Sequence, residues 1–375
     1  MKGNYNFGKV QRDFSAAGLK KTQYAWGELL QRPAMEAGAA VFPELRGARV
    51  LVTGAGGYIG SAMVRMLARS GAREMVLLEL AEQHLFEITE AMTAAGFGER
   101  CVPVLGSVCD ENLLRAVFAE RAPEMVLHAA ALKHVPLMER NPLAALETNA
   151  LGTWRLAAAA EEHGARAMVL VSTDKAVAPQ SVMGAAKRVA ELAMLRPARM
   201  RKAAVRLANV IGSPCSVGPI FAEQIARGGP VTVTHREARR FFLTVGEVTQ
   251  LLGEAMTSDA AGVLIPDPGE ALPIAELARR MMAASGRDVE MVFTEPRPGD
   301  KLDERLMAEE ERDGGAATAG LRHVLSAATD VDEQMSALSA AVAARDVQAA
   351  LRVVRELVPD YRPSAALQDA LEARV

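Results

Sequence analysis

The sequence predicts an α/β protein built on a doubly wound parallel sheet, with a smaller lobe in its C-terminal half. Three observations support this prediction. Short apolar runs alternate with helical patterns five times between residues 48 and 194, as in parallel sheets that are covered by helices. A glycine-rich turn follows the first apolar run, and polar side chains gather where the later runs end.

The bulk composition excludes several classes of function. The 375 residues carry a net charge of −3 and only 4% aromatic residues, so neither a basic field nor stacking platforms indicate binding to nucleic acid. No apolar run approaches the ~18 residues of a membrane helix, and the N-terminus has no signal-peptide core. The three cysteines (Cys101, Cys109 and Cys215) fit no metal or redox spacing. We therefore expect reduced thiols, no bound metal and a cytoplasmic protein.

Residues 1–47 are predicted to be an N-terminal extension outside the main core. A helical pattern runs from Tyr24 to Leu30 and breaks at Pro33. Tyr5 and Lys9 form a Tyr-x-x-x-Lys pair. Because this pair precedes the first core strand, we do not expect it to be catalytic.

The first core unit is a strand, a glycine loop and a helix. Residues 48–53 are apolar and β-branched, GAGGYIG follows, and a helical pattern runs from Ser61 to Arg69. Gly54, Gly57 and Gly60 are spaced by three. Such glycines serve a tight turn, a close approach of the backbone to a pyrophosphate, and helix–strand packing. The unit therefore predicts a Rossmann-like dinucleotide site.

The second strand, residues 74–79, ends in Glu79. A carboxylate at this position can bind both hydroxyls of an adenosine ribose and would repel a 2′-phosphate. The next residue is Leu80 rather than an arginine. NAD is therefore favoured over NADP, and residues 48–205 are predicted to be the NAD-binding domain.

Three more strands, at 101–108, 124–131 and 167–171, alternate with helices at 82–95, 111–120 and 143–162. Residues 131–142 are predicted to be a loop, and its His134 has no partner at metal-ligand spacing. The glycine loop, Glu79, Ala129 to Ala131 and Ser172 to Lys175 all follow strand ends. Because parallel strands end at one edge of a sheet, these groups are expected to form one site.

The fifth strand runs into VSTDKAVAPQSVMGAAKR. Asp174 lies beside Lys175, and Met183 and Lys187 open the next helix four residues apart. An acid next to an amine, with a second lysine on the following helix, is suited to proton transfer.

After residue 205 the pattern predicts that residues 206–325 form mainly a substrate-binding lobe, with returns to the NAD-binding domain near 241–267. Strands are expected at 202–212, 230–235 and 262–266, a further strand begins at 289, and helices are expected at 221–229, 245–256 and 273–285. Several arginines in this part suit a phosphorylated or nucleotide-linked substrate. Residues 326–375 are expected to be a helical segment.

These motifs resemble the extended short-chain dehydrogenase/reductases. TGAGGYIG, HAAALKHVP, STDK, Met-x-x-x-Lys and RPGDKL carry the resemblance. With NPLAALETNALGT, GGPVTVT, RRFFLT, ELLQRP and LVPDYRP, the chain is similar over residues 28–365 to the capsule and O-antigen branch of UDP-N-acetylglucosamine 4,6-dehydratases. Many members carry membrane helices ahead of this region. We expect a soluble, catalytic-domain-only member that forms a homo-oligomer.

The resemblance implies a role for each matching residue. For NAD, the implied contacts are Gly54, Gly57, Tyr58 and Ile59 at the pyrophosphate, Glu79 at the ribose, Ser107 and Val108 at the adenine, and Ala129, Ala130, Ala131, Lys133, Asn149, Ser172 and Lys187 toward the nicotinamide. The implied catalytic positions are Thr173, Asp174, Lys175, Met183 and Lys187. The implied contacts of the UDP-sugar are Lys133, Asn209, Arg240, Arg297 and Asp300.

The chain departs from the family pattern at four places. Met183 replaces the tyrosine that usually precedes the helix lysine by four residues, as it often does in this branch. Ser107 replaces an aspartate, and Tyr58 replaces a serine. The loop LANVIGSPCSVGPIF stands where FGNVLGSRGSVIPLF is more usual. The loss of the arginine–glycine pair in this loop affects the recognition of the substrate.

The implied activity is dehydration of a UDP-N-acetylhexosamine, with UDP-N-acetylglucosamine the expected substrate. Asp174 is expected to act as the acid and Lys175 as the base, with burial raising the pKa of the carboxyl and lowering that of the amine, the latter helped by Lys187 and the nicotinamide. Because Met183 cannot accept a proton, Asp174 or a water chain is expected to start the oxidation. Two alternatives stay open. A 4-epimerase uses the same scaffold but normally relies on the missing tyrosine, and a non-catalytic sugar-nucleotide-binding protein would need no intact triplet. The sequence does not determine the stereochemistry at carbon 5.

Overall fold

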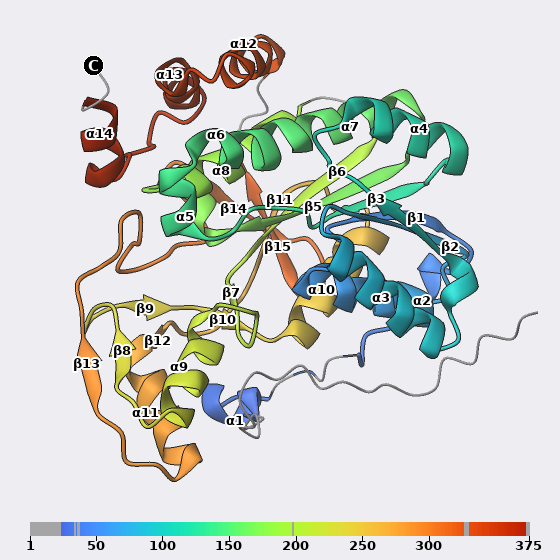
Figure 1. Ribbon diagram of the computed structural model, residues 1–375. Coiled ribbons are helices and arrows are strands. Elements are labelled where there is room, and N and C mark those ends of the chain that lie inside the picture. The colour runs from blue at the N-terminus through green and yellow to red at the C-terminus, as the bar shows by residue number, and fades with distance from the viewer. Residues whose placement is uncertain (1–23, 34, 36–37, 197–198, 326–329, 373–375) are drawn as a thin grey trace, which may run out of the picture.

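The computed structural model describes residues 24–33, 35, 38–196, 199–325 and 330–372. It confirms the predicted α/β fold (Figure 1). One nine-stranded sheet has the order β14 (Arg312–Ala316), β15 (Leu321–Leu325), β11 (Gly262–Pro266), β6 (Arg201–Leu207), β5 (Ala167–Thr173), β4 (Met125–His128), β1 (Arg49–Thr53), β2 (Glu74–Glu79) and β3 (Cys101–Leu105). All strands from β11 to β3 pair in parallel.

Helices cover both faces of the sheet. Figure 1 shows α2 (Tyr58–Arg69), α3 (Glu82–Ala94) and α10 (Val245–Thr257) on one face, and α4 (Glu111–Arg121), α7 (Gly152–Glu162) and α8 (Val182–Met194) on the other. The strands are therefore apolar on both sides, and Val50, Leu51 and Val52 of β1 are fully buried. This explains the uninterrupted apolar runs in the sequence.

The strand order reverses beside β1. The chain passes outward from β1 to β2 and β3, and then returns to β4, which pairs with the other side of β1. In open α/β sheets, ligands bind at the carboxyl ends of the strands where the order reverses. The ends of β1, β2, β4 and β5 lie along that edge, which confirms the predicted arrangement of strand ends.

The segment 131–162 differs from the prediction. The expected loop contains the short helix α5 (Val135–Arg140), and the expected helix divides into α6 (Pro142–Ala145), a π-helical turn (Leu146–Leu151) and α7. Prolines near the start of α5 and α6 explain the helix starts, because proline has no N–H to lose in the first turn of a helix.

The N-terminal segment packs into the protein. Helix α1 (Trp26–Leu30) places Leu29 in the core of the lobe, and the 3₁₀ turn Pro43–Leu45 places Leu45 in the main core. Phe42 lies so close to α10 that a Cβ on Gly253 would stand 2.0 Å from its ring. The prediction that residues 1–47 lie outside the main core is therefore wrong for residues 40–45. Tyr5 and Lys9 lie outside the described residues.

The lobe is built from short strand pairs and two helices, at the lower left of Figure 1. Its elements are β8 (Val231–Val233) with β13 (Met291–Phe293), β9 (Arg239–Arg240) with β12 (Leu272–Pro273), β7 (Asn209–Val210) with β10 (Phe242–Leu243), α9 (Val217–Ala226) and α11 (Ile274–Ser285). Strands β14 and β15 join the main sheet instead, although the sequence places them in the lobe.

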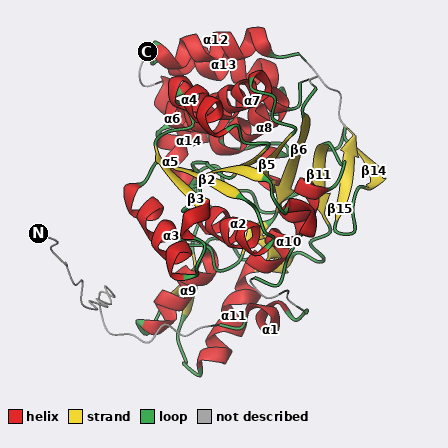
Figure 2. Ribbon diagram, turned by 90° about the vertical axis from the view of Figure 1, so that its right-hand side faces the viewer, coloured by secondary structure: helices red, strands yellow, loops and turns green. Residues whose placement is uncertain are grey.

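The C-terminal part of the chain is helical (Figure 2). Its helices are α12 (Asp332–Ala343), α13 (Val347–Leu357) and α14 (Ala365–Glu372), and α12 and α13 pack with α8 in one core.

A buried histidine at the end of β4 ties the central strands to α7. His128 Nδ1 lies 2.6 Å from Thr53 Oγ1, and its Nε2 lies 2.9 Å from Thr153 Oγ1. Burial, with a contribution from Lys187, lowers the pKa of His128 from 6.5 to about 3. The contribution of the neutral ring to the free energy of unfolding is therefore complete above pH 6.5, and it is lost as the pH falls toward 3.

We therefore expect His128→Gln to reduce the acid sensitivity of folding. Between about pH 7 and about pH 5, the wild type should lose about 2 kcal/mol more unfolding free energy than the variant. This follows because only the wild-type unfolded chain gains a proton at His128 in that range. Urea unfolding at both pH values measures the difference, and parallel losses in the two proteins would contradict the assignment.

Candidate active site

The glycine loop has the geometry of a pyrophosphate cradle. Gly54 has a φ of +65°, and a Cβ on it would lie 2.7 Å from the backbone nitrogen of Ala130. A Cβ on Gly60 would lie 2.0 Å from the carbonyl oxygen of Gly54. Gly57 caps α2 without any side-chain hydrogen bond, so Tyr58 and Ile59 in the first turn keep backbone N–H groups that suit an anion. The residues present therefore fit a dinucleotide.

Gly54→Ala is expected to weaken NAD binding about tenfold or more, because the new methyl group forces β1 and the β4 end apart beneath the cradle. Gly96→Ala is the matched control. Gly96 also has a positive φ, of +83°, but a Cβ there meets nothing within 4 Å. Calorimetric titration with NAD measures both variants. Equal affinity of Gly54→Ala and the wild type would show that the close approach is not required.

Glu79 joins the end of β2 to the glycine loop. Its carboxylate accepts hydrogen bonds from the backbone N–H groups of Gly56 at 3.0 Å, Leu80 at 3.0 Å and Ala81 at 3.1 Å. The residue is 9% exposed. Glu79 thus orders the loop in this structure, and its predicted contact with a ribose stays a prediction.

The predicted adenine and nicotinamide residues lie at the ends of β3 and β4. Ser107 and the buried Val108 follow β3, and Ala129 to Ala131 follow β4. Asn149 is fully buried in the π-helical turn, where it donates to the carbonyl oxygen of Leu132 and accepts from its N–H. π-Helical turns often mark functional sites. This one holds the backbone beside Lys133.

Two aromatic residues meet the loop after β7. The hydroxyl of Tyr58 donates to the carbonyl oxygen of Ile211 at 3.5 Å. A Cβ on Gly212 would lie 2.8 Å from Nε1 of Trp26 and 3.2 Å from the Tyr58 hydroxyl. Trp26 therefore packs against Gly212 and Gly218 in the lobe, and the Tyr58 hydroxyl lies against the same glycine, Gly212.

The helix after the fifth strand places Lys187 under that strand. Its Nζ donates to the carbonyl oxygen of Val171 at 2.6 Å, and burial lowers the pKa of this amine to about 8. Met183 is 4% exposed and belongs to an apolar cluster with Val182 and Ala186. Ser172 donates to Glu191 at 2.5 Å. Its hydroxyl is thus occupied by a buried carboxylate of α8.

The predicted acid and base form an ion pair at the end of β5. Asp174 is fully buried, and its Oδ1 accepts from Lys175 Nζ at 2.9 Å and from Thr173 Oγ1 at 3.0 Å. Lys175 Nζ also donates to Asn209 Oδ1 at 3.1 Å. Burial raises the pKa of Asp174, as expected, although the Lys175 ammonium opposes this.

The expected direction of the pKa shift of Lys175 is wrong. Burial does favour the neutral amine, but the carboxylates of Asp174 and Glu304 outweigh it and raise the pKa of Lys175. Glu304 Oε1 lies 3.5 Å from Lys175 Nζ. Sequence reasoning missed Glu304, and the available signal was its position in the RPGDKLDE phrase.

The predicted substrate residues of the lobe are partly engaged with the protein itself. Arg240 donates to the carbonyl oxygens of Lys301 at 2.6 Å and Leu302 at 2.7 Å. Arg297 Nε pairs with Asp300 at 2.7 Å. Lys133 Nζ donates to the carbonyl oxygen of Pro214 at 3.0 Å, which ties the β4 side of the site to the unusual SPCSVG loop. Their contacts with a substrate stay predictions.

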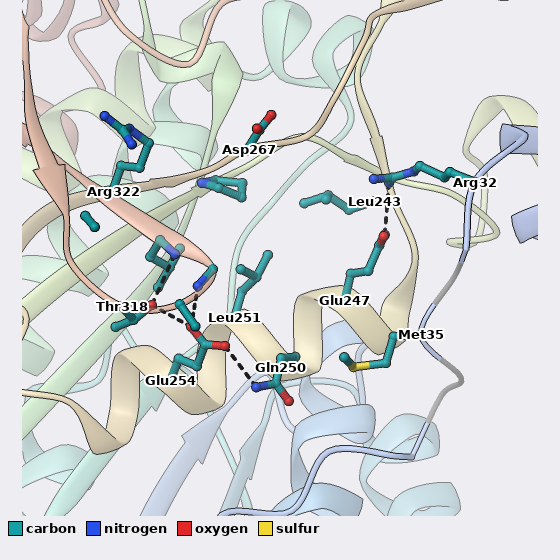
Figure 3. Close-up of a pocket in the computed structure, with 15 residues that line it drawn as sticks. Arg32, Met35, Leu243, Glu247, Gln250, Leu251, Glu254, Asp267, Thr318 and Arg322 are labelled. Carbon is teal, nitrogen blue, oxygen red and sulfur yellow. Dashed lines mark hydrogen bonds and ion pairs between the residues drawn. The ribbon is translucent and has the colours of Figure 1, made fainter.

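A separate surface cavity of about 440 Å³ lies between α10 and the β11–β15 edge of the sheet (Figure 3). Arg32, Glu247, Glu254, Asp267 and Arg322 supply its charges. Arg32 is paired with Glu247, and Glu254 binds Thr318 and Gly320. None of the predicted site residues lines this cavity. Among the described residues, no group of three or more His, Cys, Asp or Glu is placed to hold a metal ion.

The fold, strand order and glycine cradle define an extended short-chain dehydrogenase/reductase. Comparison with known families narrows this class, because residues 50–323 match the model of a family described as polysaccharide biosynthesis protein. The chain belongs to that family.

Two curated relatives and one solved structure show its similarities. The chain is 39% identical over 304 residues to the capsular polysaccharide biosynthesis protein CapD of Staphylococcus aureus, a match that covers 78% of this chain and 50% of that protein. It is 40% identical over 276 residues to the probable polysaccharide biosynthesis protein EpsC of Bacillus subtilis, covering 71% and 46%. The UDP-glucose 4-epimerase of Thermus thermophilus, solved with NAD, superposes with a TM-score of 0.59 at 26% identity, covering 67% and 88%.

The chain thus spans about half the length of the curated relatives it matches. No helix in the described part of the chain is long and apolar enough to cross a membrane.

Proposed function

We propose that this protein is an NAD-dependent 4,6-dehydratase of a UDP-N-acetylhexosamine, with UDP-N-acetylglucosamine as the substrate. The observation that carries this proposal is the hydrogen-bonded Thr173–Asp174–Lys175 cluster at the end of β5, with Asp174 fully buried, next to a helix that keeps Lys187 but has Met183 in place of a tyrosine. The family's place in polysaccharide biosynthesis and the UDP-sugar epimerase among its structural relatives support a nucleotide-sugar substrate.

The glycine cradle and the first turn of α2 would hold NAD, with Glu79 at the ribose. When bound, NAD would supply reversible hydride transfer at carbons 4 and 6 of the sugar. The proton transfers are carried out by side chains of this protein. They must accept the proton of the carbon 4 hydroxyl, remove and return the carbon 5 proton, and protonate the carbon 6 hydroxyl as it leaves.

Asp174 suits two of these transfers. Its carboxylate accepts the proton of the carbon 4 hydroxyl and donates a proton to the carbon 6 hydroxyl, so that one proton enters and one leaves as water forms. Full burial stabilises the protonated form that must exist between the two transfers. Met183 cannot accept a proton, and the usual tyrosine role therefore moves to Asp174.

Lys175 is assigned the carbon 5 proton, which its amine takes from the sugar and returns to the same carbon. This role needs the neutral amine, whereas two carboxylates surround the ammonium in the structure. Lys175 must therefore lose a proton before it acts.

One assay tests the proposal. The protein is incubated with UDP-N-acetylglucosamine and NAD, and the products are analysed by mass spectrometry. The expected product has lost one water, with no net NADH. A product of unchanged mass but altered sugar would identify a 4-epimerase, the activity named for the Thermus thermophilus relative. No change with any UDP-N-acetylhexosamine would identify a binding protein.

A further inference from the structure

Residues 297–304 form a segment that both parts of the protein hold. From the lobe, Arg239 donates its backbone N–H to the carbonyl oxygen of Leu302 at 3.1 Å. From the NAD-binding side, the carbonyl oxygen of Val177 accepts from Lys301 Nζ at 2.5 Å. Gly299 packs so closely on α8 that a Cβ there would lie 2.9 Å from Cβ of Ser181. The segment therefore has a defined position beside the end of β5.

The segment carries a buried carboxylate to the predicted base. Glu304 is 6% exposed, and its Oε1 lies 3.5 Å from Lys175 Nζ. Its Oε2 lies 3.3 Å from Lys301 Nζ. Oδ2 of Asp174 is buried and has no hydrogen-bond partner among the described residues, and the buried Oε2 of Glu304 has only the Lys301 ammonium beside it. Such groups are costly to bury, so the cluster is not explained by stability.

The chain beyond Glu304 is anchored to the sheet. Arg206 of β6 donates to the carbonyl oxygen of Leu306 at 3.0 Å and binds both carboxylate oxygens of Glu311. The same guanidinium binds Glu191 of α8, the helix that carries Lys187. Glu304 is thus presented from a rigid support, as functional groups usually are.

Four groups from four segments act on the Lys175 amine. Asp174 and Glu304 are the nearby carboxylates, and Asn209 contributes a neutral oxygen. Arg240 opposes the carboxylates at Lys175, and Lys301 and Arg240 both stabilise the ionised form of Glu304. Two anions at hydrogen-bond or ion-pair distance favour the ammonium. Asp174 alone would hold it less firmly.

We propose that Glu304 is a positioning residue for the acid–base pair: its carboxylate anchors the side chain of Lys175 beside Asp174 and controls when that amine is free to take a proton. The assignment of Lys175 as the base rests on the proposed function. The control of the Lys175 charge by Glu304 rests on the geometry alone, so the two can be tested separately.

The first measurement needs no turnover. In Glu304→Gln the shape is kept and one anion is removed, so the Lys175 amine should become neutral at a pH at least about one unit lower. Competitive acetylation at several pH values, read on the Lys175 peptide by mass spectrometry, follows this change. At about pH 8 we expect labelling of Lys175 to be about tenfold faster in the variant. Glu309→Gln, in which an 86% exposed side chain is changed, should match the wild type.

A second variant should shift the labelling of Lys175 in the opposite direction. Lys301→Met removes the cation beside Glu304 and should move Lys175 labelling to higher pH. Near-UV circular dichroism shows whether Glu304→Gln folds. If it does not, the labelling of Lys301→Met alone tests whether this segment controls the charge of Lys175. Unchanged labelling in folded Glu304→Gln, or a shift to lower pH in Lys301→Met, would overturn the inference.

Turnover then separates the inference from the proposed function. If dehydration occurs, the acid limb of kcat/KM should move to lower pH in Glu304→Gln by the same amount as the labelling, which lost packing would not produce. If labelling shifts and no dehydration is found with any UDP-N-acetylhexosamine, Glu304 controls Lys175 as inferred and the proposed function is wrong.

Discussion

Asp174→Asn should lower the turnover of dehydration by about 10²- to 10⁴-fold. The asparagine keeps the size of the side chain but can neither accept the proton of the carbon 4 hydroxyl nor protonate the leaving group. NAD affinity should change little, because the glycine cradle and Glu79 lie on other strands. Steady-state kinetics with UDP-N-acetylglucosamine and calorimetric titration with NAD measure the two effects.

Asp303→Asn is the matched control for this change. Asp303 is exposed in the 297–304 segment, so the same substitution there should leave turnover at the wild-type level. A wild-type rate in Asp174→Asn would remove the acid role from this residue. An equal loss in both variants would point to a general effect of charge on the protein.

Arg206→Met should lower the free energy of unfolding by about 3–5 kcal/mol, because it leaves two buried carboxylates without their partner. Arg206 is fully buried, Glu191 is fully buried and Glu311 is 5% exposed. The guanidinium binds both glutamates in a forked geometry, with distances from 2.6 to 3.3 Å. Arg188 also pairs with Glu191 at 2.9 Å and with Glu311 at 3.4 Å, but these two contacts cannot replace the five forked bonds of Arg206.

Urea unfolding near neutral pH measures this loss. Arg305→Met serves as the control, because Arg305 and Glu309 form an exposed pair on the same segment and such pairs contribute little. An unfolding free energy of Arg206→Met equal to that of the control would mean that the buried network is neutral to stability, as a well-packed apolar replacement sometimes is.

Local sequence patterns were sufficient to predict the sheet and the cofactor region. Buried parallel strands need continuous apolar runs, and a close turn between strand and helix needs glycine at Gly54 and Gly60. Both requirements act within a few residues of the chain. The ends of parallel strands must also meet at one edge, so the element order alone predicted that Glu79 would lie beside the glycine loop and that Thr173 would end its strand at the same edge.

The same patterns were insufficient for the segments that pack across the molecule. The extension before residue 48 looked peripheral, yet Phe42 and Leu45 fill the main core and Trp26 packs against Gly212 and Gly218 of the lobe. Strands β14 and β15 looked like part of the lobe, yet they extend the main sheet. In each case the partner lies far along the chain, and no local period records it.

The sequence by itself determined that an acid and an amine stand side by side at the end of the fifth strand, because Asp174 and Lys175 are neighbours in the chain. Only the tertiary structure decided the charge of that amine. The charge of Lys175 depends on its neighbour Asp174 together with Glu304, which the 297–304 segment holds 3.5 Å away, and these two carboxylates outweigh the effect that burial alone would have.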